Sequence, residues 1–264
     1  TFSLDVRDTF AVPNLERNAE MLAATWKRSP YASDVDGFIA IDPVFIQEMV
    51  KLNGNITLQD GTVLTGDNTA QYLLNTIYKE VPIAQQDAYF EYIAQTVVNE
   101  AFGKMNTQKM LNMAQSVGDL IEQRHFYAYT TKYFQESGIS GKESTPQIGI
   151  YLNEQNPSKL GWYIDRQAKV TKTGTGENGA RTYHVRYTLT NTLTDTEKAS
   201  ASAYILGGMG NNPVAVAGTS VQRMLFYAPA GGSIGKITST GDVRDQRKAT
   251  MDGKQLTTNV AYIA

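Results

Sequence analysis

Residues 36–64 constrain the fold more than any other part of the sequence. The apolar run 38–41 is bounded by a glycine and a proline, which predicts a short strand buried on both faces. Asp42 followed by Pro43 is typical of a helix N-cap and first turn. Gly54 is placed to end that helix in a left-handed conformation. A strand leading directly into a capped helix predicts a mixed α/β core.

A hairpin and further helices extend this core. Asp60-Gly61, between two short apolar segments, predicts a β-hairpin. Apolar residues also recur at helical spacing and predict four more amphipathic helices. The segments that carry this spacing are Leu15–Trp26, Ala70–Ile77 (with a start near Thr65 or Asp67), Phe90–Ala101 and Met110–Ile121.

The hydrophobic period changes in the second half of the chain. Segment 125–130 predicts a returning strand, 131–138 a short helix, and the polar stretch that follows a linker. From Gln147 onward the period is two, as in Leu160, Trp162 and Ile164 and in Tyr183, Val185, Tyr187 and Leu189. We therefore expect an α/β domain over residues 1–140 and a β-rich, sandwich-like domain over 146–264, with the boundary near 138–146.

Composition excludes some classes of protein. The chain has 24 Lys and Arg against 26 Asp and Glu, a net charge of −2, with no basic cluster, so we expect no nucleic-acid partner. Fifteen Tyr with no Cys suits either a secreted protein of a disulfide-poor lineage or a cytosolic one. No apolar run is long enough to span a membrane. Because both ends of the sequence read as structured, we expect a fragment whose targeting or anchoring segment lies outside it.

Motifs for metal binding or nucleophilic catalysis are missing. His125 and His184 have no ligand-spaced partner, and Asp34, Asp36 and Asp42 lack the spacing of a calcium loop. Asp36 suits a turn and Asp42 a cap. There is no GxSxG, no Walker A sequence and no GxGxxG leading into a helix. We therefore expect no metal.

Several segments carry a family resemblance. VPNLERNAEML and DGFIAIDPVFIQEMVKLNGNITLQDGTVLTGDNTAQYLLNTIYKEV resemble an uncharacterised family of actinobacterial cell-envelope proteins, a domain of unknown function. The later segments IGIYLNEQNPSKLGWYIDRQAKV, YTLTNTL and LFYAPAG are similar to the C-terminal part of that family. More distantly, the first part resembles the LytR–CpsA–Psr phosphotransferase fold. The resemblance implies an α+β or α/β fold and an extracellular location in a Gram-positive cell envelope.

The LytR–CpsA–Psr resemblance implies transfer of a glycopolymer from a polyprenyl-pyrophosphate carrier to peptidoglycan. Such enzymes hold the pyrophosphate with arginines, aspartate and a divalent cation. Arg7-Asp8 occupies the place of the family's Arg-Asp pair at a strand end. Tyr72 and Asp87 match two further positions, but the arginines that follow them in the enzymes are missing, and Lys79 is the nearby cation. Arg7, Asp8 and Lys79 are therefore the predicted ligand-binding residues, and no catalytic residue is assigned.

Three functions remain open at this point. The first is an envelope protein that binds or handles a lipid-linked glycopolymer without catalysis and without a cofactor. The second is an active phosphotransferase using a divalent cation, and the third is a structural or adhesive protein. Both ligand-binding readings predict an apolar groove ending near Arg7, whereas the third predicts a filled core. Membrane attachment would come only from an N-terminal segment outside this chain. The predicted walls for a polyprenyl tail are Leu73, Ile77, Phe90, Ile93 and Val97.

Overall fold

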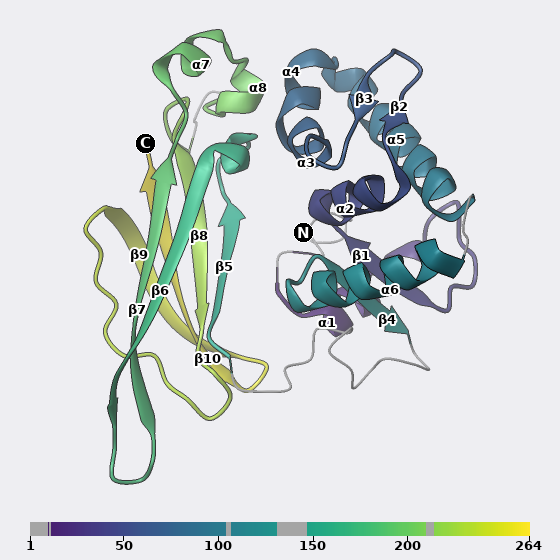
Figure 1. Ribbon diagram of the computed structural model, residues 1–264. Coiled ribbons are helices and arrows are strands. Elements are labelled where there is room, and N and C mark those ends of the chain that lie inside the picture. The colour runs from purple at the N-terminus through teal and green to yellow at the C-terminus, as the bar shows by residue number, and fades with distance from the viewer. Residues whose placement is uncertain (1–9, 11, 104–106, 131–146, 210–213) are drawn as a thin grey trace. The chain divides into compact units, whose positions relative to one another are not determined.

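A computed structural model describes two compact units of the chain (Figure 1). The units are residues 1–147 and 148–264. The described residues contain both helices and strands, so the chain is of the mixed α and β class that the sequence predicts. The described residues are 10, 12–103, 107–130, 147–209 and 214–264. The predicted boundary at 138–146 and the predicted helix at 131–138 lie outside them.

The N-terminal unit is built mainly from helices. The helices are α1 (Leu15–Trp26), α2 (Pro43–Asn53), α3 (Thr69–Gln71), α4 (Ile77–Glu80), α5 (Ile83–Gly103) and α6 (Thr107–Glu122). A π-helical turn, Tyr72–Thr76, joins α3 to α4 into one helical run. This run begins at Thr69, later than predicted, because the Asn68 side chain accepts a hydrogen bond from the Thr65 amide and holds the preceding residues in a turn. The helices predicted over Leu15–Trp26, Phe90–Ala101 and Met110–Ile121 are confirmed by α1, α5 and α6.

The start of α2 follows the predicted capping chemistry. Asp42 Oδ1 accepts hydrogen bonds from the amides of Val44 and Phe45, each at 3.0 Å, and Pro43 occupies the first turn. At the other end, the Gly54 amide donates to the Val50 carbonyl. Gly54 has φ 99° and ψ 166°, an extended conformation open to glycine rather than the left-handed helical one that was predicted.

The predicted hairpin is confirmed. Strands β2 (Ile56–Thr57) and β3 (Val63–Leu64) pair antiparallel, with Ile56 opposite Leu64. Gly61 takes the positive φ of 87° that the turn requires. Asp60 Oδ1 accepts from the Thr62 amide at 2.9 Å, which fixes the turn from the other side.

The strand at 38–41 differs from the prediction in its burial. β1 (Gly37–Ile41) pairs antiparallel with β4 (Phe126–Thr130), which confirms the returning strand. Ile39 is 69% exposed and Ile41 44% exposed, so the prediction of a strand buried on both faces is wrong. Among the described residues β1 pairs only with β4, and a two-stranded sheet leaves more of each face open than a sheet covered on both sides would.

The hydrophobic core of this unit lies around α2, α5 and the hairpin. Phe45 of α2 stacks on Phe126 of β4, with ring centroids 5.3 Å apart. The buried members of the core are Met49, Val50, Ile56, Leu58, Leu64, Tyr72, Leu73, Ile77, Ile93, Val97 and Leu120. Within the described residues, no helix is long and apolar enough to cross a membrane.

The C-terminal unit contains a four-stranded antiparallel sheet in the order β5-β8-β10-β9. Its elements are β5 (Gly149–Glu154), β6 (Ile164–Thr175), β7 (Arg181–Asn191), α7 (Asp195–Ser200), α8 (Ala203–Leu206), β8 (Ser220–Tyr227), β9 (Asp242–Met251) and β10 (Lys254–Ile263). Leu160–Tyr163 forms a 3₁₀ turn, so the strand predicted to begin there starts only at Ile164. In this segment Leu160 and Tyr163 are both buried, whereas a strand would place them on opposite faces.

Strands β6 and β7 form a long two-stranded ribbon. Eleven register pairs join them, from Ile164–Asn191 to Thr175–Arg181, with one irregularity between Lys172 and Gly174. The turn end of this ribbon extends beyond the neighbouring strands of the same unit (Figure 1). Most ribbon side chains are exposed, whereas Val185, Tyr187 and Leu189 are half-buried, and these three belong to the set predicted to share one face.

Candidate functional site

The structure leaves the predicted ligand residues largely untested. Arg7 and Asp8 lie outside the described residues. Lys79 is exposed near the end of α4, and Asp87 is exposed on α5. Tyr72, which like Asp87 is predicted to match a position of the LytR–CpsA–Psr family, is buried in the π-helical turn.

A small apolar pit lies between the end of β1, α2 and α5. Its volume is about 40 Å³, and only apolar side chains line it: Ile41, Phe45, Ile46, Met49, Ala94, Val97 and Val98. Two of these, Ile41 and Val98, are 44% and 48% exposed at the surface. Ile39 is two residues before Ile41, and because side chains alternate along a strand it extends the same apolar face. The pit can therefore hold an apolar group but offers no polar partner to it.

The residues predicted to line a lipid groove have a different role. Leu73, Ile77, Ile93 and Val97 are each at most 4% exposed and belong to the filled core, and Phe90 packs against them. Of the five, only Val97 also borders the pit. The helical spacing identified the core face of α5 correctly, but the open apolar positions, Ala94 and Val98, lie beside that face.

A chain of hydroxyl groups connects the hairpin to the helices. The Tyr89 hydroxyl, on α5, donates a short hydrogen bond to Asp60 Oδ2, and it lies 3.1 Å from the Tyr72 hydroxyl. One turn further along α5, the Tyr92 hydroxyl accepts from the Gln59 amide at 3.0 Å. These contacts attach the turn of the hairpin to α5.

The protonation states of this network follow from its geometry. The hydrogen bond from Tyr89 holds the pKa of the Asp60 carboxyl below its ordinary value of 3.8. Partial burial, followed by the bonds to Asp60 and Tyr72, raises the pKa of the Tyr89 phenol well above 10. At neutral pH Tyr89 is therefore a fixed donor and Asp60 a fixed acceptor, an arrangement that stabilises structure and does not supply a general base.

His125 pairs with the cap of α2. Its Nδ1 lies 2.6 Å from Asp42 Oδ2, while Asp42 Oδ1 caps the helix. A histidine oriented by a carboxylate could assist a nucleophile. Among the described residues no hydroxyl is bonded to this imidazole, and the pair joins α2 to the segment leading into β4.

In the C-terminal unit, the Glu154 carboxylate accepts several hydrogen bonds. It accepts hydrogen bonds from the Ser220 hydroxyl (2.6 Å), the Gln222 amide group (2.9 Å) and the Val221 amide (2.8 Å). It also accepts from the Asn156 amide at 3.0 Å. These bonds join the ends of β5 and β8, and a carboxylate with its lone pairs occupied in this way serves the fold.

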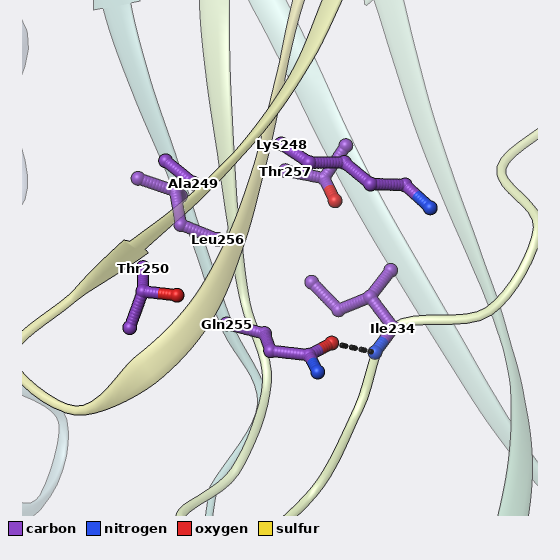
Figure 2. Close-up of a pocket in the computed structure, with 7 residues that line it drawn as sticks. All are labelled: Ile234, Lys248, Ala249, Thr250, Gln255, Leu256 and Thr257. Carbon is purple, nitrogen blue, oxygen red and sulfur yellow. Dashed lines mark hydrogen bonds between the residues drawn. The ribbon is translucent and has the colours of Figure 1, made fainter.

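A hollow of about 390 Å³ lies beside β9 and β10 (Figure 2). The Ile234 amide donates to Gln255 Oε1 at 3.3 Å across it, and Lys248 is the one charged residue of its lining. Its side chains do not converge on one point (Figure 2). Ligand sites normally combine an enclosed apolar cavity with converging polar groups, and this hollow has neither.

A metal site in a protein needs several ligating side chains close together. Across residues 12–103, 107–130, 147–209 and 214–264, no three His, Asp or Glu side chains lie together in a way that could hold an ion. The expectation that the protein has no metal stays a prediction.

Sequence reasoning missed the pit and the hydroxyl chain for different reasons. Ala94, Val97 and Val98 repeat at helical spacing and would have indicated a second apolar stripe on α5. The Tyr89–Asp60 bond joins residues 29 positions apart, and no local pattern predicts it.

The fold therefore belongs to the mixed α and β class. Its N-terminal unit has an apolar pit, and the described residues contain no assembled catalytic group. A family model described as protein of unknown function (DUF4012) matches residues 1–78, a segment that runs from the N-terminus into α4. The predicted resemblance to an uncharacterised family of unknown function is thereby confirmed for this segment. No curated protein and no solved structure matches the chain.

Proposed function

We propose that the N-terminal unit binds the hydrocarbon part of a lipid-linked glycopolymer of the cell envelope, without catalysing its transfer. The observation that carries the proposal is the pit lined only by apolar side chains, next to the exposed Ile39 and Ile41. Exposed apolar surface around an apolar depression is typical of binding sites for apolar ligands. The proposal places the protein outside the cell, attached through a segment beyond this chain.

The size of the pit restricts how such a ligand binds. About 40 Å³ accommodates the end or one branch of a hydrocarbon chain, and the rest of the chain would lie over Ile39, Ile41 and Val98. An isoprenoid chain carries a methyl branch on each unit, so it fits a shallow pit better than a straight alkyl chain. In the proposal, this preference distinguishes polyprenyl carriers from ordinary acyl lipids.

The proposal also includes a finer description of the fold. We take the N-terminal unit to be related to the LytR–CpsA–Psr fold and the C-terminal unit to a β-sandwich, in which the β6–β7 ribbon forms part of a second layer. The capped helix after β1 and the Asp60-Gly61 hairpin support the first relation. The antiparallel four-stranded sheet supports the second.

Binding of farnesyl phosphate, measured by titration calorimetry, tests the proposal. Ala94→Leu would fill the pit, and we expect it to lower the affinity about tenfold, equivalent to about 1.4 kcal/mol. Ala88→Leu is the matched control, because Ala88 lies on α5 but does not line the pit. It should change the affinity less than about twofold.

A straight-chain dodecyl phosphate should bind more weakly than farnesyl phosphate. If neither ligand binds, or if Ala94→Leu and Ala88→Leu bind farnesyl phosphate with equal affinity, the proposal fails. A structural role for the protein is then favoured. Circular dichroism of each variant verifies that the fold is retained.

A further inference from the structure

The β6–β7 ribbon carries an excess of positive charge within a chain of negative net charge. Residues 164–191 contain five Lys and Arg against two acidic residues, whereas the whole chain has a net charge of −2. The basic residues are Arg166, Lys169, Lys172, Arg181 and Arg186. Because they are divided between two strands, they form no run of basic residues in the sequence, and the pairing of β6 with β7 brings them onto one ribbon.

Two of these cations lie directly opposite each other. Lys169 on β6 is the register partner of Arg186 on β7, and His184 is opposite Thr171 on the same face. All four side chains are exposed. Like charges in a directly opposed pair destabilise a sheet, so this arrangement is unfavourable for the isolated ribbon.

No carboxylate offsets the pair. None of the ion pairs recorded in the described part of the C-terminal unit involves a basic residue of the ribbon. Asp165 is on the same face as Lys169, four residues along the strand, which corresponds to about 13 Å. An external anion would therefore find both cations available.

The rest of this face indicates the chemistry of the anion. Alternation places Gln167, Thr171, Thr188 and Thr190 around the cations, and all are exposed. Apart from the imidazole of His184, the face contains no aromatic side chain on which a nucleic-acid base could stack, and it contains no apolar side chain that could enter a lipid layer. Threonine hydroxyls and an amide beside two cations suit a polymer that carries both hydroxyl groups and negative charges.

We propose that this face of the β6–β7 ribbon, centred on Lys169 and Arg186, binds an acidic polysaccharide. The cations contact its anionic groups, and the surrounding hydroxyls and amide bond to its sugar hydroxyls. The negative charge of the polymer removes the repulsion between the two opposed cations. This surface belongs to the C-terminal unit and does not depend on the lipid binding proposed for the N-terminal unit.

The test compares two double variants of the intact chain. K169Q/R186Q removes both cations of the proposed face, and R166Q/K172Q removes the same number of charges from the opposite face of the same ribbon. Binding to fluorescent dextran sulfate is measured by anisotropy at low salt, with uncharged dextran as the ligand control. The wild type should bind dextran sulfate alone, and raising the salt concentration should weaken the binding. K169Q/R186Q should lose at least about tenfold in affinity and R166Q/K172Q less than about threefold.

The other outcomes overturn the proposal. Equal losses in the two variants would mean a general effect of charge, and unchanged binding in K169Q/R186Q would mean that the cations only keep the ribbon soluble. Tighter binding to oligothymidine, to an acidic peptide such as polyglutamate or to phosphatidylglycerol vesicles would assign the face to another partner. Thermal unfolding gives a second readout: removing the opposed pair should leave the unfolding temperature of the unliganded protein equal or higher, and a clear decrease would show that the cations stabilise the fold.

Discussion

Tyr89 is the residue at which the hairpin and the helices of the N-terminal unit meet. Its hydroxyl donates to Asp60 in the turn of the hairpin and neighbours Tyr72 in the π-helical turn. The strands of this hairpin are only two residues each, too short to be stable without support. The position of the hairpin therefore depends on the burial of its own apolar side chains and on the tyrosine hydroxyls of α5.

Tyr89→Phe tests this dependence. We expect the free energy of unfolding to fall by about 1 kcal/mol, the usual contribution of one hydrogen bond, as measured by urea denaturation at neutral pH. Tyr31→Phe is the control, because Tyr31 is 75% exposed, and its substitution should have little effect. Equal stability of the two variants would show that packing of the ring alone holds the hairpin.

The hydrogen bond from Tyr89 to Asp60 also makes the free energy of unfolding depend on pH in the acid range. The folded protein holds the pKa of Asp60 below its ordinary value of 3.8, chiefly through Tyr89, so the ionised carboxylate favours the folded state. This contribution is complete above pH 3.8 and is lost as the pH falls through the lower folded value. In Tyr89→Phe, the loss of stability between pH 5 and pH 2 should be smaller than in the wild type. An unchanged slope would mean that other carboxylates determine the acid sensitivity.

At the scale of elements, the Asp42 side chain contacts both the start of α2 and the residue before β4. One carboxylate oxygen caps α2 and the other contacts His125, just before β4. Because β4 is the partner of β1, this single side chain connects the beginning of α2 to both strands of the small sheet.

Asp42→Ala should destabilise the protein by about 1–2 kcal/mol, the range for loss of an N-cap. Asp42→Asn keeps a capping oxygen but removes the charge that faces His125, so its loss should be smaller. Asp36→Ala, in the turn before β1, serves as control and should be nearly neutral in thermal unfolding. If the alanine and asparagine variants lose equal stability, the contact with His125 matters more than the cap.

The elements that sequence reasoning found are those specified by neighbouring residues. Asp42-Pro43 and Asp60-Gly61 act through their own backbone, and both were predicted correctly. The exposure of Ile39 was not predicted correctly, because it depends on how many strands pair with β1. Strand β9 was missed altogether, since its charged sequence, DVRDQRKATM, lacks apolar alternation. The Asp252-Gly253 turn after it, with φ of 52° and 74°, was the available signal.

The candidate sites depend on contacts between distant residues, which explains why they could not be predicted. Lys169 and Arg186 become neighbours only through the register of β6 and β7. The pit requires Ile41 and Val98 to meet. A local pattern can place each residue on a face of its element, but the partner of that face is decided by tertiary packing.

At the scale of the whole molecule, the two units are separate in their strand pairing. In the described residues, every ladder lies within one unit. The C-terminal unit also has a core of its own, which includes Leu225, Tyr227 and Leu256. A unit with its own sheet and core can fold alone.

We therefore expect a fragment of residues 148–264 to fold without the rest of the chain. Far-ultraviolet circular dichroism should show a β-rich spectrum, and heating should give one cooperative transition. The intact chain is the reference for the position of that transition. A fragment that shows no cooperative transition would mean that the C-terminal sheet requires the N-terminal unit.

The position of β10 in its sheet affects the order in which a newly synthesised chain can fold. β10 follows β9 in sequence but lies between β8 and β9, and it pairs with both. Until residues 254–263 leave the ribosome, β8 has one unoccupied edge and β9 has no partner in the sheet. Exposed strand edges favour association between chains. The nascent C-terminal unit is therefore most exposed to aggregation, and to chaperones that bind extended segments, in the interval just before its last strand emerges.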